Sequence, residues 1–394
     1  MKRRRGTGLA LAAVLGLSGC GTVVSGTPQA DPSGSVHLDT GNYPTTPRQV
    51  LGRTGDDARV QGSYQLADYL VAPAEVNDKI DTTAYFPVLV ISDLATLVSS
   101  VGMNLGGVLD GHVGGINVAQ KVADPDATTP EQQMNTLLLR YPTADDAKAR
   151  LAKLRSGFPP VGGSGAPLAK YPDAFEGGTP EKIGGSPMFW LQHDEYLIGA
   201  GFLNFRSRSA VDTTVTAYFD KQIARLNTVS FSPAETANFP QSDRDGIMRL
   251  TREQEGHSNG ARYATAWMSP HAYAMATDGT WADKVKKLDR AGIDLVAHSA
   301  NTIYRAKEPE GAQMYARLVT EGIGSSPGEQ VEPAPGGVPG ARCASQLTKA
   351  NGKERRAYNC TIAVGRYVAV DTGPSLTAAQ QGAAASYLIL KEAK

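Results

Sequence analysis

An internal repeat constrains the fold of this chain more than any other feature of its sequence. Residues 135–154 (NTLLLRYPTADDAKARLAKL) read as a short apolar strand, a turn and an amphipathic helix, and residues 301–322 (NTIYRAKEPEGAQMYARLVTEG) repeat that order. Both stretches have Asn-Thr before the strand and Ala-Arg-Leu in the helix. Residues 67–73 (ADYLVAP) and 264–270 (ATAWMSP) are a weaker third match. Self-similarity of this kind indicates duplicated structural units.

A hairpin and a further helix follow this unit in each half. Residues 188–205 read as two strands around the polar turn 193–195, and residues 358–370 as two strands around Gly365-Arg366. A Gly-X pair suits a tight hairpin turn. The helices that follow are expected at residues 209–226 and 376–391.

The order of these elements predicts the fold class. Helices between strands that pair locally indicate an α+β fold, and we expect two related domains, each an antiparallel sheet with helices packed on one face. If the halves are true repeats, residues 135–226 should superpose on residues 301–391. Leu137 and Ile303 should then lie on equivalent strands.

The first 19 residues, 1–19, read as a secretion signal. Residues 2–5 are basic, residues 9–17 are apolar and residues 18–19 are small, which is the order of a signal peptide. The apolar run cannot span a bilayer, because a spanning helix needs roughly 20 residues. The sequence therefore predicts an exported protein.

Cys20 ends this signal in a way that resembles a bacterial lipobox. Leucine, two small residues and then cysteine form the pattern in which the cysteine thiol receives a diacylglyceryl group before cleavage. We predict that Cys20 is lipidated and anchors the protein to the extracytoplasmic face of the cell membrane. The alternative is an ordinary signal with an incidental cysteine. Residues 20–48 are rich in Gly, Pro, Ser and Thr and are expected to form a flexible tether.

About 350 residues remain beyond the tether, which is enough for two domains. The segment 230–246 (SFSPAETANFPQSDRDG) is rich in polar residues and turn formers and is the expected boundary. We assign an N-terminal α+β domain to residues 49–238 and a C-terminal α+β domain to residues 239–394.

Two of the three cysteines, Cys343 and Cys360, are left once Cys20 is lipidated. An even number of cysteines in an exported protein predicts a disulfide. Cys343 follows a Gly/Pro-rich loop and Cys360 lies in the first strand of the predicted hairpin, so the bond should tie that loop to the sheet. A metal or redox pair is the alternative, but the spacing does not match CxxC and no histidine pattern accompanies it.

Charge and motifs exclude several functions. The chain has 39 basic and 39 acidic residues, and loss of the basic signal leaves a mildly acidic protein without a basic patch, so we expect no nucleic-acid partner. Residues 256–260 (GHSNG) match the serine-hydrolase pattern around Ser258, but the preceding residues are too polar for the required strand. The six histidines show no zinc-binding spacing. We predict no catalytic residue, no metal and no cofactor.

The most apolar part of the mature chain is residues 85–98 together with the glycine-rich residues 101–115. These glycines lack the Walker lysine and the Rossmann spacing, which argues against a phosphate-binding loop. The region could line a groove for an apolar ligand. Packing in the core is the favoured interpretation.

Four segments carry a resemblance to a known family. They are LDTGNYPTTPR after the tether, VPGARC and YNCTIAVGRYVAV near the end, and LTAAQQGAAASYLIL in the last helix. The chain resembles an uncharacterised family of actinobacterial envelope lipoproteins, known as a domain of unknown function. The resemblance implies a lipid-anchored, two-domain exported protein with a C-terminal disulfide, and it supplies no catalytic residues.

These features together favour a non-enzymatic envelope lipoprotein. Its two domains would bind a lipid-like small molecule or another envelope protein. A hydrolase that acts on envelope lipid or glycan is the alternative. A pocket with a serine or a carboxylate pair would favour the hydrolase, a long apolar cavity would favour cargo binding, and flat surfaces would favour a protein partner.

Overall fold

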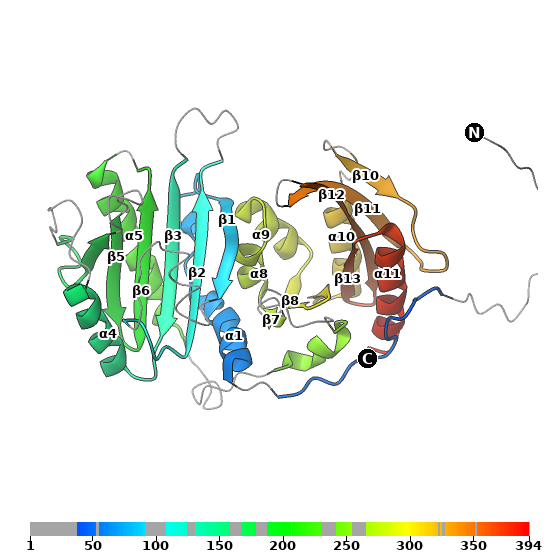
Figure 1. Ribbon diagram of the computed structural model, residues 1–394, viewed down its shortest axis with the longest axis horizontal. Coiled ribbons are helices and arrows are strands. Elements are labelled where there is room, and N and C mark those ends of the chain that lie inside the picture. Colours follow the sequence, from blue (N-terminus) through cyan, green and yellow to red (C-terminus); the bar gives the residue numbers. More distant parts are fainter. Residues whose placement is uncertain are drawn as a thin grey trace, which may run out of the picture. The chain divides into compact units, whose positions relative to one another are not determined.

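Two antiparallel sheets, one in each half of the chain, form the framework of the structure (Figure 1). The computed structural model places the described residues, which begin at Leu38, in one compact unit, while Cys20 and the predicted signal lie outside them. Among the described residues, every helix is too short or too polar to span a bilayer. The structure describes residues 38–52, 55–90, 108–123, 131–157, 167–178, 187–205, 207–229, 242–253, 265–321, 324, 328–350 and 353–393.

The N-terminal sheet has the strand order β1-β2-β3-β6-β5-β4, and each neighbouring pair is antiparallel. Strands β5 and β6 form the predicted hairpin, and helix α5 follows them. The strands are β1 (Thr82–Val90), β2 (Gly114–Lys121), β3 (Gln133–Arg140), β4 (Phe175–Gly178), β5 (Pro187–His193) and β6 (Tyr196–Leu203). The helices of this half are α1 (Gly55–Leu66), the 3-10 turn η1 (Ala67–Tyr69), α2 (Pro73–Val76), α4 (Ala144–Gly157) and α5 (Arg208–Leu226).

The C-terminal sheet has the strand order β10-β11-β12-β13-β9-β8-β7 and is also antiparallel throughout. Its strands are β7 (Ala266–Met268), β8 (Ile293–His298), β9 (Asn301–Ala306), β10 (Glu329–Glu332), β11 (Arg342–Ala350), β12 (Lys353–Val364) and β13 (Tyr367–Gly373). Its helices are the 3-10 turns η3 (Arg244–Gly246) and η4 (Met248–Leu250), α8 (Pro270–Ala276), α9 (Trp281–Arg290), α10 (Pro309–Thr320) and α11 (Leu376–Lys391).

The two sheets have the same topology. Read from the opposite end, the second sheet runs β7-β8-β9-β13-β12-β11, which matches the first strand for strand, and β10 is an addition at its edge. Helices α4 and α10 follow the third strand of each half, and α5 and α11 follow the hairpin. The predicted α+β class with two related halves is confirmed. The third sequence match is wrong, because residues 67–69 form a 3-10 turn whereas residues 266–268 form β7.

The hairpins fix which residues of the two halves correspond. Each has a two-residue turn followed by a tyrosine, and that tyrosine pairs with an arginine at the end of the third strand. Tyr196 pairs with Arg140 in the first half, and Tyr367 pairs with Arg305 in the second. These pairs provide a common origin from which the other positions of the two sheets can be counted.

This register corrects one detail of the sequence alignment. Leu137 and Ile303 do lie on equivalent strands, β3 and β9, but Leu138 is the residue that corresponds to Ile303. The Asn-Thr match in the sequence is therefore one residue out of register. Because successive side chains of a strand point to opposite faces, such a shift would exchange the two faces of the sheet.

Helices cover both faces of each sheet, where the sequence predicted one. In the first half, Leu137 packs in the same apolar cluster as Leu154 of α4, and Leu138 packs in the cluster that contains Val215 of α5. The second half repeats this arrangement, with α10 on one face and α11 on the other. A central strand such as β3 has buried apolar side chains on both of its faces. Each face must therefore be shielded from solvent by a helix, so helices pack on two faces and not on one.

A large core cluster joins the two halves. Gln61 of α1 reaches into the second half, where its amide nitrogen donates to the Trp267 carbonyl at 2.8 Å and its oxygen accepts from the Trp267 N–H at 3.2 Å. These bonds satisfy both backbone groups of one residue in the short edge strand β7. The junction is thus held by buried hydrogen bonds as well as by apolar packing.

The N-terminal strap, residues 38–50, lies against the second half of the chain. The ring of Tyr43 is 4.3 Å from the guanidinium carbon of Arg252, a cation–π contact. Asp39 accepts hydrogen bonds at 3.1 Å from the amide of Gln381 in α11. Figure 1 shows this strap in blue beside the red helix α11.

The strap corrects the prediction that residues 20–48 are a flexible tether. Residues 38–48 are held against the second half by particular side chains, among them Arg48, which donates to the carbonyl of Met248 at 3.2 Å and to the hydroxyl of Thr251 at 3.0 Å. A segment poor in apolar residues can be ordered in this way when its few large side chains find partners on a folded surface. Composition alone does not reveal such partners.

Candidate binding pocket

A pocket of about 360 Å³ opens between helix α10 and strands β11 and β12 in the second half. This volume is at the lower end of the range that small-molecule sites occupy. Its lining combines one helix, two strands and the loop that leads into β11. The lining residues are Gln313, Ala316, Arg317, Pro339, Gly340, Arg342, Thr361 and Ala363.

Two alternating residues of β12 form the floor of the pocket. Thr361 and Ala363 line it, whereas Cys360 and Ile362 belong to the apolar cluster beneath α11 on the opposite face. This alternation is the ordinary consequence of the strand period of two. Both floor residues are small, so the sheet leaves open space below the helix.

The helix contributes a wall of three residues. Gln313, Ala316 and Arg317 are three and four positions apart, which places them on one face of α10. The small Ala316 lies between the two long polar side chains in the sequence. Pro339 and Gly340 close the side of the pocket, and Gly340 has a φ of 68°, a conformation that favours glycine.

Two arginines make the pocket positive. Arg317 from α10 and Arg342 from β11 both line it, and no acidic side chain is among the described lining residues. The guanidinium of Arg342 donates to the hydroxyl of Thr320 at 3.3 Å, which helps to fix its direction. Both arginines are exposed, so an incoming ligand can reach their guanidinium groups.

The corresponding place in the first half is filled. Counted from the hairpin turn, Trp190 of β5 corresponds to Thr361, and its partner Phe175 of β4 corresponds to Arg342. Trp190 is fully buried, and a β-carbon on Gly199 opposite it would come within 3.1 Å of the indole ring. An aromatic pair above a glycine therefore occupies the space that forms the pocket in the second half.

A serine, a histidine and an acid also meet at the junction of the halves. The Ser269 hydroxyl donates to the Asp68 carboxylate and accepts from the Ala272 N–H, so it caps helix α8. The His271 ring bonds the Leu70 carbonyl at 3.1 Å instead of Ser269. Burial raises the pKa of Asp68 to about 6, although the Ser269 hydrogen bond opposes this. This arrangement caps a helix and lacks the nucleophile–base contact of a hydrolase.

The remaining motifs assemble no site in the described part of the chain. The predicted polar turn at 193–195 is present, with Asp194 at a φ of 46°. Within the described residues, no three His, Cys, Asp or Glu side chains come together as metal ligands. Ser258 lies outside the described residues, as do residues 101–107 of the glycine-rich segment 101–115.

A second polar cluster is closed to solvent. Arg252 and Asp371 form an ion pair at 2.9 Å, with side chains 4% and 0% exposed. The Ser386 hydroxyl donates to Asp371 at 3.0 Å, and the side chain of Asn301 accepts from the Arg252 N–H at 2.9 Å. Burial raises the pKa of Asp371, and the Arg252 charge opposes that shift. No ligand can reach these groups, so the cluster is structural and fixes η4, β13 and α11 together.

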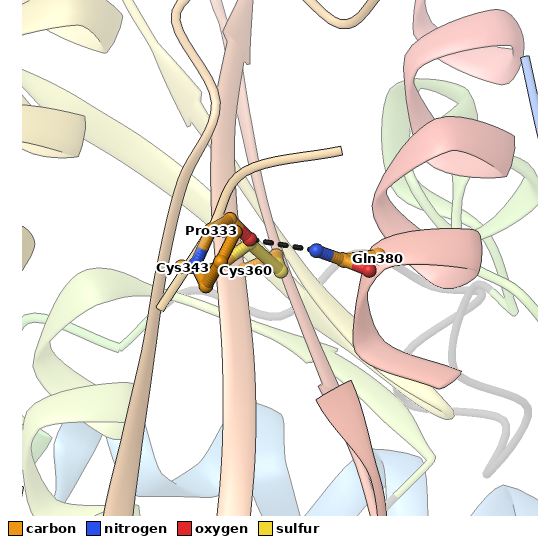
Figure 2. The surroundings of a disulfide bond; sticks show 4 residues. All are labelled: Pro333, Cys343, Cys360 and Gln380. Atoms are coloured by element: carbon orange, nitrogen blue, oxygen red, sulfur yellow. Dashed lines mark hydrogen bonds between the residues drawn. A yellow bond between two sulfur atoms is a disulfide. The ribbon is translucent and has the colours of Figure 1, made fainter. Parts of the chain in front are cut away.

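The structure bonds Cys343 to Cys360, which are directly paired residues of β11 and β12 with Cα atoms 4.1 Å apart. Cys343 lies within β11, so the bond links two strands instead of tying a loop to the sheet. Figure 2 shows the disulfide beside Gln380 of α11, whose amide donates to the Pro333 carbonyl at 2.7 Å. The loop after β10 is therefore held by this hydrogen bond to the last helix.

The architecture defines a class of protein, a tandem pair of α+β units in which the second unit carries an open, positive pocket. The chain belongs to a family described as a domain of unknown function (DUF7373), whose N-terminal model matches residues 51–241 and whose C-terminal model matches residues 247–393. No curated protein matches the sequence.

Among solved structures, the extracellular domain of PknH from Mycobacterium tuberculosis matches with 13% sequence identity and a TM-score of 0.26. The match covers 46% of this chain and 100% of that one. A likeness of this size carries no argument about function.

The pocket residues are the functional candidates that sequence reasoning missed. Arg317, Arg342 and Thr361 belong to no motif, and they are more than 20 residues apart on average in the chain. Alignment of the two hairpins by their turns would have set Thr361 against Trp190. A large residue replaced by a small one in a repeat is a signal of open space.

Proposed function

We propose that the protein is a lipid-anchored, exported module of an actinobacterial cell envelope that binds a small polar ligand and catalyses no reaction. The pocket beneath α10 is the observation that carries this proposal. Its described lining offers hydrogen-bond donors from Gln313, Arg317, Arg342 and Thr361 and no base that would activate the Thr361 hydroxyl for nucleophilic attack. Such a lining can hold and orient a ligand.

The polar lining favours a different ligand from the apolar one that the sequence suggested. The apolar side chains of the lining belong to Ala316, Pro339 and Ala363, and all three are small. A long acyl chain would find little to contact there. A polar molecule with acceptor atoms matches the donors of the pocket.

The lipid anchor rests on the residues that end at Cys20. We expect Cys20→Ser to remove acylation and to move the protein from the membrane fraction to a soluble or uncleaved form. Mass spectrometry of the N-terminal peptide and fractionation of cells measure both effects. Membrane association that is unchanged in this variant, with no acyl mass on the wild type, would contradict the anchor.

Ligand binding can be tested without knowing the ligand. Native mass spectrometry of the exported protein should detect a co-purifying small molecule, and the double variant Arg317→Gln/Arg342→Gln should lose it. Arg290→Gln is the matched control, because Arg290 is exposed at the end of α9 and lies outside the pocket. Hydrolysis of an envelope lipid or glycan by the purified protein would instead support the hydrolase.

A further inference from the structure

We propose that the pocket recognises an oxyanion, a phosphate or carboxylate group at one end of its ligand. This inference rests on the proposed function, since it names the chemical class of ligand for the same pocket. Two arginines line the pocket from different elements, Arg317 from α10 and Arg342 from β11. Each presents a planar fork of N–H donors that matches the oxygens of a carboxylate or phosphate.

The surroundings leave this positive charge available. Among the described residues, no ion pair involves either arginine, and the neighbouring lining residues are neutral. Elsewhere in the second half, Arg305 is neutralised by Asp294 and Asp245, a pairing that Arg317 and Arg342 lack within the described part of the chain. Two arginines without a carboxylate in one concave site favour a bound anion.

Neutral donors complete the site. The Gln313 amide and the Thr361 hydroxyl can donate to oxygens that the guanidinium groups leave unbound. Gln313 and Arg317 are one turn apart on α10, so both can contact the same ligand group. Thr361 is directly paired with Arg342 across β11 and β12, which brings a hydroxyl and a guanidinium to one side of the ligand.

The repeat shows that this is a departure from the shared scaffold. The first half has the aromatic pair Phe175 and Trp190 at the positions of Arg342 and Thr361. Threonine in place of tryptophan at position 361 opens space, and arginine in place of phenylalanine at position 342 adds charge. The second half has both, which together produce a cavity with a positive wall.

The experiment is a calorimetric titration of the full-length protein in detergent with inorganic phosphate, glycerol phosphate, acetate and glucose. We expect at least one of the three anions to bind and glucose to fail. Arg317→Gln and Arg342→Gln should each weaken the anion about tenfold, the effect of losing one charge-assisted hydrogen bond. Arg290→Gln should leave binding unchanged. Preference for glycerol phosphate over inorganic phosphate would indicate a lipid headgroup as the source.

A second variant separates failure of this inference from failure of the proposed function. Thr361→Trp with Val370→Gly copies the Trp190–Gly199 pair into the second half and should abolish binding of any ligand. Suppose that glucose binds, that this double variant blocks glucose binding and that neither Arg→Gln variant weakens it. The oxyanion inference is then wrong, and the proposed ligand-binding function remains supported. If none of the four compounds gives heat and the co-purifying ligand survives the variant, both proposals fail.

Discussion

The two halves use one sheet topology for two different purposes. Beneath α4, Trp190 and Phe175 fill the space between helix and sheet, and Gly199 gives the indole the room it needs. Beneath α10, Thr361 and Arg342 take the places of these aromatic residues, and a pocket remains. A unit whose helix–sheet space is filled by aromatic side chains can thus serve as a scaffold, while its repeat, with the same strand order, carries a binding site.

A second difference concerns charge inside the fold. Asp371 of β13 corresponds to Ala200 of β6, so the buried ion pair with Arg252 has no counterpart in the first half. The N-terminal strap covers this ion pair through Tyr43. The half that carries the pocket is thus also the half fixed by a buried ion pair, a strap and a disulfide.

Asp371→Ala should have the largest effect on stability. It leaves the Arg252 charge buried without a partner, and we expect the free energy of unfolding to fall by about 3–5 kcal/mol. Urea denaturation followed by circular dichroism measures this loss. The double variant Arg252→Met/Asp371→Ala should recover most of it, because no charge then remains buried. A double variant as unstable as the single one would contradict this explanation.

Trp190→Thr tests the filled half by giving it the residue of the open half. Removal of a fully buried indole leaves a cavity beneath α4, and we expect a loss of about 3–4 kcal/mol in unfolding free energy. The new cavity would be lined by apolar side chains such as Leu139 and Leu151, so no anion should bind there. A loss below about 1 kcal/mol would mean that α4 moves onto the sheet and fills the cavity. Trp190 would then not be the residue that holds α4 in its place.

The order of elements could be predicted from the sequence because it depends on local patterns. Alternating apolar residues, a two-residue turn at Gly365-Arg366 and a serine before each last helix are visible without the fold. In the structure Ser207 and Ser375 each accept from the N–H three residues later, at 3.2 Å in both helices. Such signals act over a few residues and do not require knowledge of distant contacts.

The register, the strap and the pocket could not be predicted for the opposite reason. Asn135 and Asn301 look equivalent in the sequence, and only the strand pairing shows that they are one position apart. Tyr43 reads as part of a loop until its Arg252 partner, far along the chain, is known. The pocket depends on small side chains at Thr361 and Ala363, which form no motif and stand out only when the register sets Thr361 against Trp190.

The strand pair β11–β12 is joined by a disulfide, whereas the corresponding pair β4–β5 of the first sheet is not. Cys343 and Cys360 correspond to Glu176 and Phe189, and in the first half Glu176 forms an ion pair with Arg208 at 2.7 Å instead of a covalent link. We expect the double variant Cys343→Ala/Cys360→Ala to lose about 3 kcal/mol of unfolding free energy without changing membrane location.

Glu176→Gln is the matched control in the other half, at the position that corresponds to Cys343. It removes the buried carboxylate and leaves the 35% exposed Arg208 paired with Asp212, so the loss should be about 1 kcal/mol or less and the urea midpoint should shift much less. Two free thiols in the exported, unreduced wild type, detected by a thiol reagent, would refute the disulfide. Equal losses in both variants would remove the distinction between the two strand pairs.

The junction that joins the two halves should make stability depend on pH. Burial raises the pKa of Asp68 to about 6 from an ordinary 3.8, so the folded protein holds a proton that the unfolded chain releases between those values. The contribution of Asp68 to stability is therefore fully present below about pH 4 and should fall by about 1–2 kcal/mol as the pH rises to 6, with partial exposure of the side chain limiting the loss. Urea midpoints at pH 4, 5, 6 and 7 measure this slope for wild type and Asp68→Asn. The Asn variant can still accept the Ser269 hydrogen bond but does not titrate, so its stability should change less over this range. The same slope in both proteins would show that another group is responsible and that Asp68 does not couple the halves to pH.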